Sequence, residues 1–311
     1  MASITPSVAS VLGRFTKAAR PCDLQAGVPL ELEGRGRTCV IDLPGPPGAP
    51  TVILIHALAT TAALSWYPSM HALAEHYRVI AFDQRWHGRG IRSATFSLED
   101  CADDVVAVAD ALGVERFSVA GYSMGGAIAQ LVWRRHRDRV EGMVLAATSR
   151  NFRGTAQERA WFRITGATMA RFGERARLGM ERRSSRLSDT PMGLTSDAAK
   201  VGPWAMAEFR STSGWALFAA LDAIGRFDSS AWIRRVDVPV SVIVAERDRA
   251  IPTRRQHSLA AAIPGAISYE FAGGHAGLVL GADEFVPVLL EACQSVTRRI
   301  RQVPSPRPTS S

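Results

Sequence analysis

Apolar strands and amphipathic helices alternate along the first half of the chain. Runs of apolar, β-prone residues predict strands at 38–43, 51–56, 78–82, 117–120 and 142–147. Helical spacing of apolar residues predicts helices at 62–75, 98–112 and 127–135. Residues 21–37 are predicted to be irregular. This alternation is typical of an α/β fold, a right-handed, doubly wound and mostly parallel sheet that binds ligands at the carboxyl ends of its strands.

The pattern changes in the second half. Residues 149–233 show helical spacing only, and strands resume at 240–244 and 268–271 before a final helix at 283–301. We therefore expect a sheet-containing core at 25–148 and 234–302 that is interrupted by a helical cap at 149–233. The remaining parts are an N-terminal amphipathic segment, 1–24, and a Pro/Ser-rich tail, 303–311, that is predicted to be disordered.

The N-terminal segment carries apolar residues at helical spacing, namely Val8, Val11, Leu12 and Phe15. We expect it to dock against the body of the protein, and peripheral contact with a membrane is the alternative. It does not have the form of a signal peptide, because Pro6, Arg14 and Lys17 interrupt any apolar stretch.

Composition narrows the class of protein. With 311 residues, of which 47% are hydrophobic, the chain can bury a large core, and it has no apolar run of the length that a membrane span needs. Its four cysteines and seven histidines are scattered, so we expect reduced thiols, a cytoplasmic location, no metal site and no cofactor.

Part of the net charge of +8 lies between Arg150 and Arg186, a stretch that contains ten arginines and three glutamates. No nucleic-acid-binding motif accompanies this excess, so nucleic acid is not an expected partner. A solvated helix face is the preferred interpretation, with an anionic membrane surface as the alternative. The sequence indicates no oligomeric state.

The candidate chemistry centres on a serine between glycines. Gly121-Tyr122-Ser123-Met124-Gly125 joins a predicted strand to a predicted helix, and G-x-S-x-G in this setting predicts a nucleophile elbow. Such a turn exposes the hydroxyl at the end of the sheet, with the N-terminus of the next helix beneath it.

A serine hydroxyl needs an adjacent base, and the base needs an anion to orient it. Asp248 follows the strand at 240–244, and His275 lies in a glycine-rich loop after the last strand. Glu246 is a reserve candidate for the acid. The order Ser, Asp, His along the chain is the one expected of an α/β-hydrolase triad.

Four separate motifs make the chain resemble the α/β-hydrolase superfamily with a helical cap, over roughly residues 25–300. They are the His56 segment, the segment Phe82 to Gly90, the elbow and the Asp248/His275 pair. The resemblance implies Ser123 as nucleophile, His275 as general base and then acid, and Asp248 as its orienting carboxylate.

An oxyanion hole should accompany these groups. The Met124 N–H is the natural first donor, and the resemblance places the second on Leu58. The chain departs from the family pattern at Ala57 and Trp86, where glycine is commoner. His56 and His87 are interpreted as scaffold residues that hydrogen-bond loops.

These observations predict a cofactor-free serine hydrolase that cleaves a small-molecule, apolar carboxylic ester through an acyl-enzyme. Trp161, Met206 and Trp215 of the cap are candidates for the substrate pocket. The same triad also serves C–C bond hydrolysis and perhydrolysis, and a weakly catalytic ligand-binding protein of this fold is a further alternative.

Overall fold

The fold is described from a computed structural model. The structure describes residues 22–154, 158, 160, 162, 164, 193–194, 197–212 and 214–302. The side chains at 198, 199, 215 and 216 are not part of that description. The predictions for the N-terminal segment before residue 22, for most of the arginine-rich stretch and for the tail at 303–311 lie outside these residues.

Eight strands form one sheet in the order β1-β2-β4-β3-β5-β6-β7-β8. Their bounds are β1 Val28–Leu32, β2 Gly36–Leu43, β3 Thr51–Ile55, β4 Arg78–Phe82, β5 Phe117–Tyr122, β6 Val140–Ala146, β7 Val240–Ala245 and β8 Ile267–Phe271. The strands from β4 through β8 in this order run parallel, and β2 and β1 extend the sheet in antiparallel fashion. The predicted doubly wound and mostly parallel α/β fold is confirmed.

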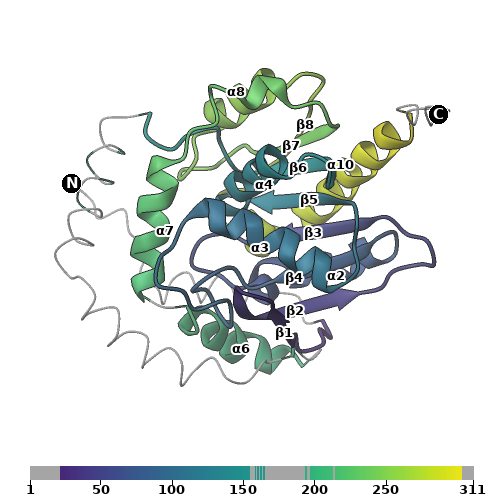
Figure 1. The fold of residues 1–311 in the computed structure, drawn as a ribbon, viewed down its shortest axis with the longest axis vertical. Coiled ribbons are helices and arrows are strands. Elements are labelled where there is room, and N and C mark those ends of the chain that lie inside the picture. Colours follow the sequence, from purple (N-terminus) through teal and green to yellow (C-terminus); the bar gives the residue numbers. More distant parts are fainter. Residues whose placement is uncertain are drawn as a thin grey trace.

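Helices cover both faces of this sheet (Figure 1). Their bounds are α2 Ala62–Ala74, α3 Leu98–Ala111, α4 Met124–Arg135, α6 Ala198–Arg210, α7 Gly214–Arg226, α8 Thr253–Ala262, α9 Gly277–Leu280 and α10 Ala282–Gln302, with a short 3-10 turn at Ile233–Arg235. Helices α3, α4 and α8 pack on one face, and α2 and α10 pack on the other.

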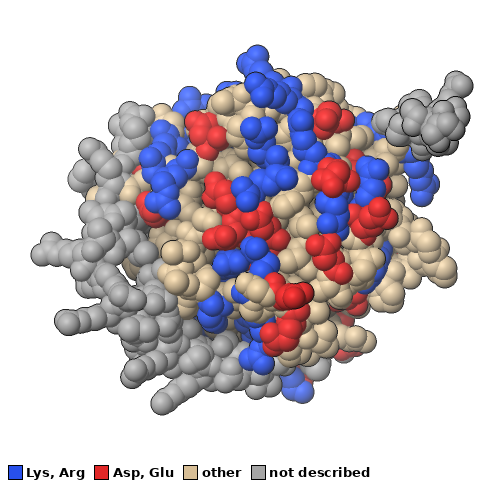
Figure 2. Space-filling model, in the orientation of Figure 1, with Lys and Arg blue, Asp and Glu red and all other residues tan. Residues whose placement is uncertain are grey.

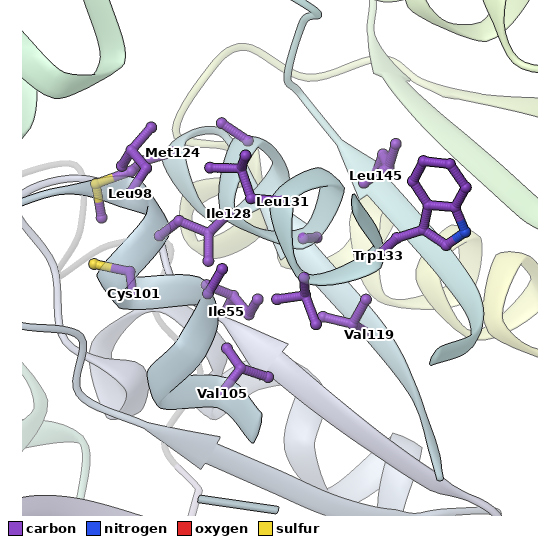
Figure 3. Close-up of a cluster of buried hydrophobic side chains, with 14 of the residues drawn as sticks. Ile55, Leu98, Cys101, Val105, Val119, Met124, Ile128, Leu131, Trp133 and Leu145 are labelled. Atoms are coloured by element: carbon purple, nitrogen blue, oxygen red, sulfur yellow. The ribbon is translucent and has the colours of Figure 1, made fainter. Parts of the chain in front are cut away.

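Alternation along the strands divides the core into two apolar layers. In β3, Ile53 and Ile55 belong to the layer under α3 and α4, whereas Val52 and Leu54 belong to the layer under α2 and α10. Figure 3 shows part of the first layer, with Ile55 between Ile128 of α4 and Val105 of α3 in this view. Because both faces are covered, β3 and β7 are apolar along nearly their whole length.

Local signals set several element boundaries. The Ser97 hydroxyl accepts a 3.0 Å hydrogen bond from the Asp100 N–H and so caps the N-terminus of α3. After α3 the chain reverses at Gly113, whose φ of +65° suits glycine. Ser97 and Gly113 therefore mark the two ends of α3, close to the boundaries that the sequence predicts.

The prediction for the segment before β2 is wrong. Residues 21–37 are not irregular throughout, because β1 pairs with β2 from Val28 opposite Val40 to Leu32 opposite Gly36. As an edge strand it buries little, and Val28 is 61% exposed. Pro29 is tolerated at an edge, where its lack of an N–H costs least. The strand therefore lacks the apolar run that reveals the others, and Pro29 interrupts the short alternation of Val28, Leu30 and Leu32.

Helices α6 and α7 lie between β6 and β7 in the chain, within the segment predicted as a cap. The two ends of this segment come together, because Asn151 forms an antiparallel bridge with Asp228. The segment thus leaves and rejoins the sheet at nearly one place. A second bridge pairs Leu194 with Leu24.

Charges of both signs are interspersed on the face that carries α3 and α4 (Figure 2). Several arginines there are paired, such as Arg135 with Asp103 at 2.8 Å and Arg139 with Asp110 at 2.6 Å. The described part of this face therefore presents a mixed surface rather than a basic patch.

Candidate active site

Ser123 occupies the tight turn between β5 and α4. Its backbone has φ 55° and ψ −114°, a left-handed conformation that is rare for a residue other than glycine. Two flanking glycines make room for the turn. A Cβ on Gly121 would lie 2.1 Å from the carbonyl oxygen of Gly125, and one on Gly125 would lie 2.1 Å from that of Ile55. Any side chain at these positions would push the turn away from the sheet.

The serine hydroxyl meets the predicted histidine. Ser123 Oγ lies 2.9 Å from Nε2 of His275, and Nδ1 of His275 lies 2.8 Å from Oδ2 of Asp248. The three residues follow β5, β8 and β7, whose carboxyl ends share one edge of the sheet. The structure therefore brings together the three residues predicted as a triad.

The carboxylate of Asp248 is enclosed by hydrogen-bond donors. Oδ1 accepts from the N–H groups of Ala250 (2.8 Å) and Ile251 (2.9 Å), and Oδ2 accepts from the side chain of Gln256 (3.1 Å) as well as facing His275. The side chain of Asp248 is fully buried, so these donors replace water around the anion. The reserve acid, Glu246, is exposed, and the carboxylate that meets the imidazole is that of Asp248.

The backbone of His275 is also held. The hydroxyl of Tyr122, the residue before the serine, donates a 3.1 Å hydrogen bond to the carbonyl oxygen of His275. Burial raises the pKa of the Tyr122 phenol, which therefore stays protonated as a donor. The loop that carries the histidine is thus attached to the elbow.

The two predicted oxyanion donors belong to adjacent segments. Met124 begins α4, and Leu58 lies in the loop after β3. These segments touch, because a Cβ on Gly125 would lie within 2.8 Å of the carbonyl oxygens of both Ile55 and His56. Among the residues described, the N–H groups of Met124 and Leu58 donate to no other protein group.

His56 and His87 are buried and lie outside the Ser–His–Asp chain. Nε2 of His56 accepts from the Gln84 N–H at 2.8 Å, so its Nδ1 carries the proton and donates to the carbonyl oxygen of Ala57. His87 Nδ1 lies 2.9 Å from the carbonyl oxygen of Arg85. Burial lowers the pKa of His56 to about 4 and that of His87 to about 3, which keeps both rings neutral. They hydrogen-bond loops, as the sequence predicts.

A buried charged network lies beside the loop that carries Leu58. Glu208 of α6 accepts hydrogen bonds from the Thr61 hydroxyl (2.6 Å) and from Arg89 (2.9 Å). Asp83 accepts from the backbone N–H groups of Ala62 and Arg89, each at 2.8 Å. Burial raises the pKa of both Asp83 and Glu208, and the Arg89 guanidinium opposes this shift. The network joins α6 to the start of α2.

Trp86 is accommodated inside the protein. It is 1% exposed, has a φ of 65° and packs in the apolar layer with Ile91 and Phe96. The guanidinium of Arg92 lies 5.3 Å from its ring. Trp86, which stands where glycine is commoner in the family pattern, therefore fills space in the core.

The predicted pocket residues are only partly described. Met206 lies on α6 and is half-buried. Trp215 lies on α7, where only its backbone is described, and Trp161 lies outside the described residues. The prediction that these residues bind substrate stays a prediction.

Sequence reasoning missed Gln256, Tyr122 and Glu208. Gln256 and Glu208 had a weak signal, since each is a polar residue on the buried face of a helix. Tyr122 had none, because a tyrosine in a buried strand is ordinary. Among the described residues, no cluster of side chains is arranged to hold a metal ion. No described helix is both long and apolar enough to cross a bilayer.

Comparison with known proteins agrees with this geometry. The family model described as alpha/beta hydrolase fold matches residues 50–282. Over 92 residues, the chain is 34% identical to 3-oxoadipate enol-lactonase 1 from Acinetobacter baylyi. The matched stretch is 30% of this chain and 34% of that protein. The chain thus spans about a third of that relative.

Longer matches cover most of the chain. RutD from Escherichia coli, named as a provisional carbamate hydrolase, is 26% identical over 251 residues, which are 80% of this chain and 90% of that protein. The crystal structure of the enol-lactonase from Burkholderia xenovorans LB400 superposes with a TM-score of 0.66 at 24% identity, over 86% of this chain and 100% of that one. The chain is therefore a hydrolase of the alpha/beta hydrolase fold family.

Proposed function

We propose that this protein is a serine hydrolase that cleaves a carboxylic ester through an acyl-enzyme, without a cofactor. The observation that carries the proposal is the continuous hydrogen-bonded chain from Ser123 through His275 to Asp248, with the serine held in a left-handed turn. A structural serine has no need of a buried carboxylate behind its hydrogen-bond partner.

The geometry supports a specific sequence of proton movements. His275 Nε2 removes the Ser123 proton as Oγ attacks the ester carbonyl, and Asp248 stabilises the imidazolium that forms. The N–H groups of Met124 and Leu58 stabilise the oxyanion. The intermediate then expels the alcohol, which takes its proton from His275.

Hydrolysis of the acyl-enzyme repeats this sequence with water. His275 removes a proton from the water as its oxygen attacks the acyl carbonyl, and it returns the proton to Ser123 Oγ as the acid leaves. The free serine and the neutral imidazole are restored.

The names of relatives support an ester-like substrate. A lactone is a cyclic ester, and the Acinetobacter baylyi relative is named an enol-lactonase. A solved structure at 25% identity, with a TM-score of 0.62, is that of Est816, titled an N-acyl homoserine lactone degrading enzyme.

We extend the proposal to a cap at 149–233 that supplies an apolar pocket, with Met206, Trp215 and Trp161 as its candidate contacts.

We place the protein in the cytoplasm. All four cysteines are free thiols, which suits a reducing compartment, and three of them are buried.

A fluorophosphonate probe tests the nucleophile directly. We expect rapid labelling of the wild-type protein that is lost in Ser123→Ala and kept in Ser118→Ala, a control on the same strand. A panel of p-nitrophenyl esters of graded chain length then measures the acyl preference. Absence of labelling together with absence of ester turnover would overturn the proposal in favour of a ligand-binding protein of this fold.

A further inference from the structure

Gln256 is a buried amide beside the candidate triad. It lies in the first turns of α8 and is 0% exposed. Its Oε1 accepts the backbone N–H of Ala245 at 2.9 Å, and its Nε2 donates to the carbonyl oxygen of Ile251 at 2.8 Å and to Oδ2 of Asp248 at 3.1 Å. Since the Ala245 contact needs an acceptor and the Ile251 contact needs a donor, the orientation of the amide is fixed.

These bonds enclose the segment that carries Asp248. Ala245 is the last residue of β7, and Ile251 lies just before α8. One side chain therefore joins the end of the strand, the loop and the helix. Movement of this loop would break several buried hydrogen bonds at once, each of which is costly to leave unmade.

Gln256 and His275 share one oxygen of the carboxylate. Both donate to Oδ2, while Oδ1 is occupied by the Ala250 and Ile251 amides. A partial rotation of the carboxylate would weaken its bonds to all four donors, so the plane of the carboxylate is fixed with one oxygen directed toward the imidazole. The neutral amide also donates a hydrogen bond to the Asp248 carboxylate without adding a charge to the site.

We infer that Gln256 is a positioning residue, which holds Asp248 in the orientation that keeps His275 aligned with Ser123. This inference rests on the proposed serine hydrolase. Gln256 acts through Asp248, and among the described residues its hydrogen bonds go to Ala245, Asp248 and Ile251 rather than to the serine or the imidazole.

Two substitutions separate orientation from simple packing. Gln256→Met keeps the length of the side chain and removes every hydrogen bond. We expect kcat to fall about tenfold with KM changed less than about twofold, because a tenfold loss corresponds to one hydrogen bond to a charged group.

Gln256→Glu keeps an acceptor for Ala245 and places a carboxyl group against Oδ2 of Asp248. Two buried carboxyl groups at this distance share one proton, because like charges there cannot both ionise, and the shared proton replaces the lost donor to Oδ2. We expect kcat at neutral pH to be at least about threefold higher than in Gln256→Met, and to fall more steeply than in wild type as the pH rises and the pair loses this proton.

The chain offers a matched control in Gln130. This glutamine is also 0% exposed and fully hydrogen-bonded, to the carbonyl oxygens of Gly126 and Ser149 and to the hydroxyl of Ser229. It does not contact Asp248. Gln130→Met should lower resistance to urea, as Gln256→Met does, while kcat stays within about twofold of the wild-type value.

Esterase profiles on the best p-nitrophenyl ester, with urea unfolding to verify folding, decide the question. Wild-type kcat in a folded Gln256→Met, or an equal loss of kcat in Gln130→Met, overturns the positioning role. If Gln256→Met fails to fold, Gln256→Glu decides, and a kcat whose pH dependence matches that of the wild type overturns the role. Failure of the hydrolase proposal is recognised separately, as wild-type protein that neither turns over esters nor reacts with the fluorophosphonate.

Discussion

The hydroxyl of Thr61 donates a 2.6 Å hydrogen bond to Glu208, which joins the N-terminal cap of α2 to α6. Thr61 also accepts the Leu64 N–H, so one hydroxyl serves both helices. The carboxylate is itself paired with Arg89, whose side chain is only 10% exposed. A buried ion pair therefore fixes α6 beside the loop that carries Leu58.

Removing this carboxylate should destabilise the protein. We expect Glu208→Gln to lower the free energy of unfolding by about 3 kcal/mol, because it leaves the buried Arg89 cation without its main partner. Urea unfolding at pH 7 measures this. As a control, Asp103→Asn removes a surface partner of Arg135 and should cost less than about 1 kcal/mol. Equal losses in the two variants would contradict the prediction.

The hydrogen bond between Ser123 and His275 predicts a large catalytic effect. His275→Ala should lower kcat/KM for an activated ester by at least about a thousandfold, the scale of triad deletions, while the variant stays folded. Circular dichroism and single-substrate kinetics measure both properties. A loss smaller than about tenfold would show that His275 is not the general base.

The close approach of α4 to β3 predicts that Gly125 tolerates no side chain. Gly125→Ala should cost at least about 2 kcal/mol of stability, because its Cβ would overlap the backbone oxygen of Ile55. Thermal and urea unfolding measure the loss. Gly274→Ala is the matched control, since the nearest atom to its Cβ is 3.4 Å away, and it should cost less than about 1 kcal/mol. A stable Gly125→Ala would disprove the contact.

The buried histidines predict how stability depends on pH. His87 is neutral when folded, with its pKa lowered to about 3, but takes up a proton on unfolding below about pH 6.5. The unfolded state therefore binds more protons, and stability falls as the pH falls from 6.5 toward 3. His87→Gln should reduce the slope of unfolding free energy against pH, between pH 6 and 5, by about 1.4 kcal/mol per unit.

Comparing the two slopes isolates the histidine from the buried carboxyl groups. Asp83 and Glu208 have raised pKa values, so acidification favours their folded forms and opposes the histidine effect. These groups are present in both proteins, and their contribution cancels in the difference. Identical slopes for wild type and His87→Gln would mean that His87 is protonated in the folded state.

Strands β2 to β8 and the three residues that meet at the sheet edge could be predicted because their signals are local. Ser123, Asp248 and His275 each follow an apolar strand, and the topology then places them at one edge of the sheet. Gln256 could not be assigned a role in this way. Its partners, Ala245 and Asp248, are fixed only when α8 packs back on β7, and no spacing rule encodes that packing.

Strand β1, at the edge of the sheet, could not be predicted for a different reason. Val28 and Glu31 of β1 are exposed, so burial places no demand on their side chains. Glu208 was missed because a single acidic residue in a helix is usually solvated, and only the meeting of α6 with Arg89 and Thr61 buries it.

The pairing of β6 with β7 has a consequence during synthesis. Met143 lies opposite Val240, so nearly a hundred residues must leave the ribosome before β6 gains its second neighbour. Until then the nascent chain carries an apolar strand with an open edge, which is the kind of surface that recruits chaperones or self-associates. Translation pauses between these two strands should therefore govern the yield of soluble protein more strongly than pauses elsewhere.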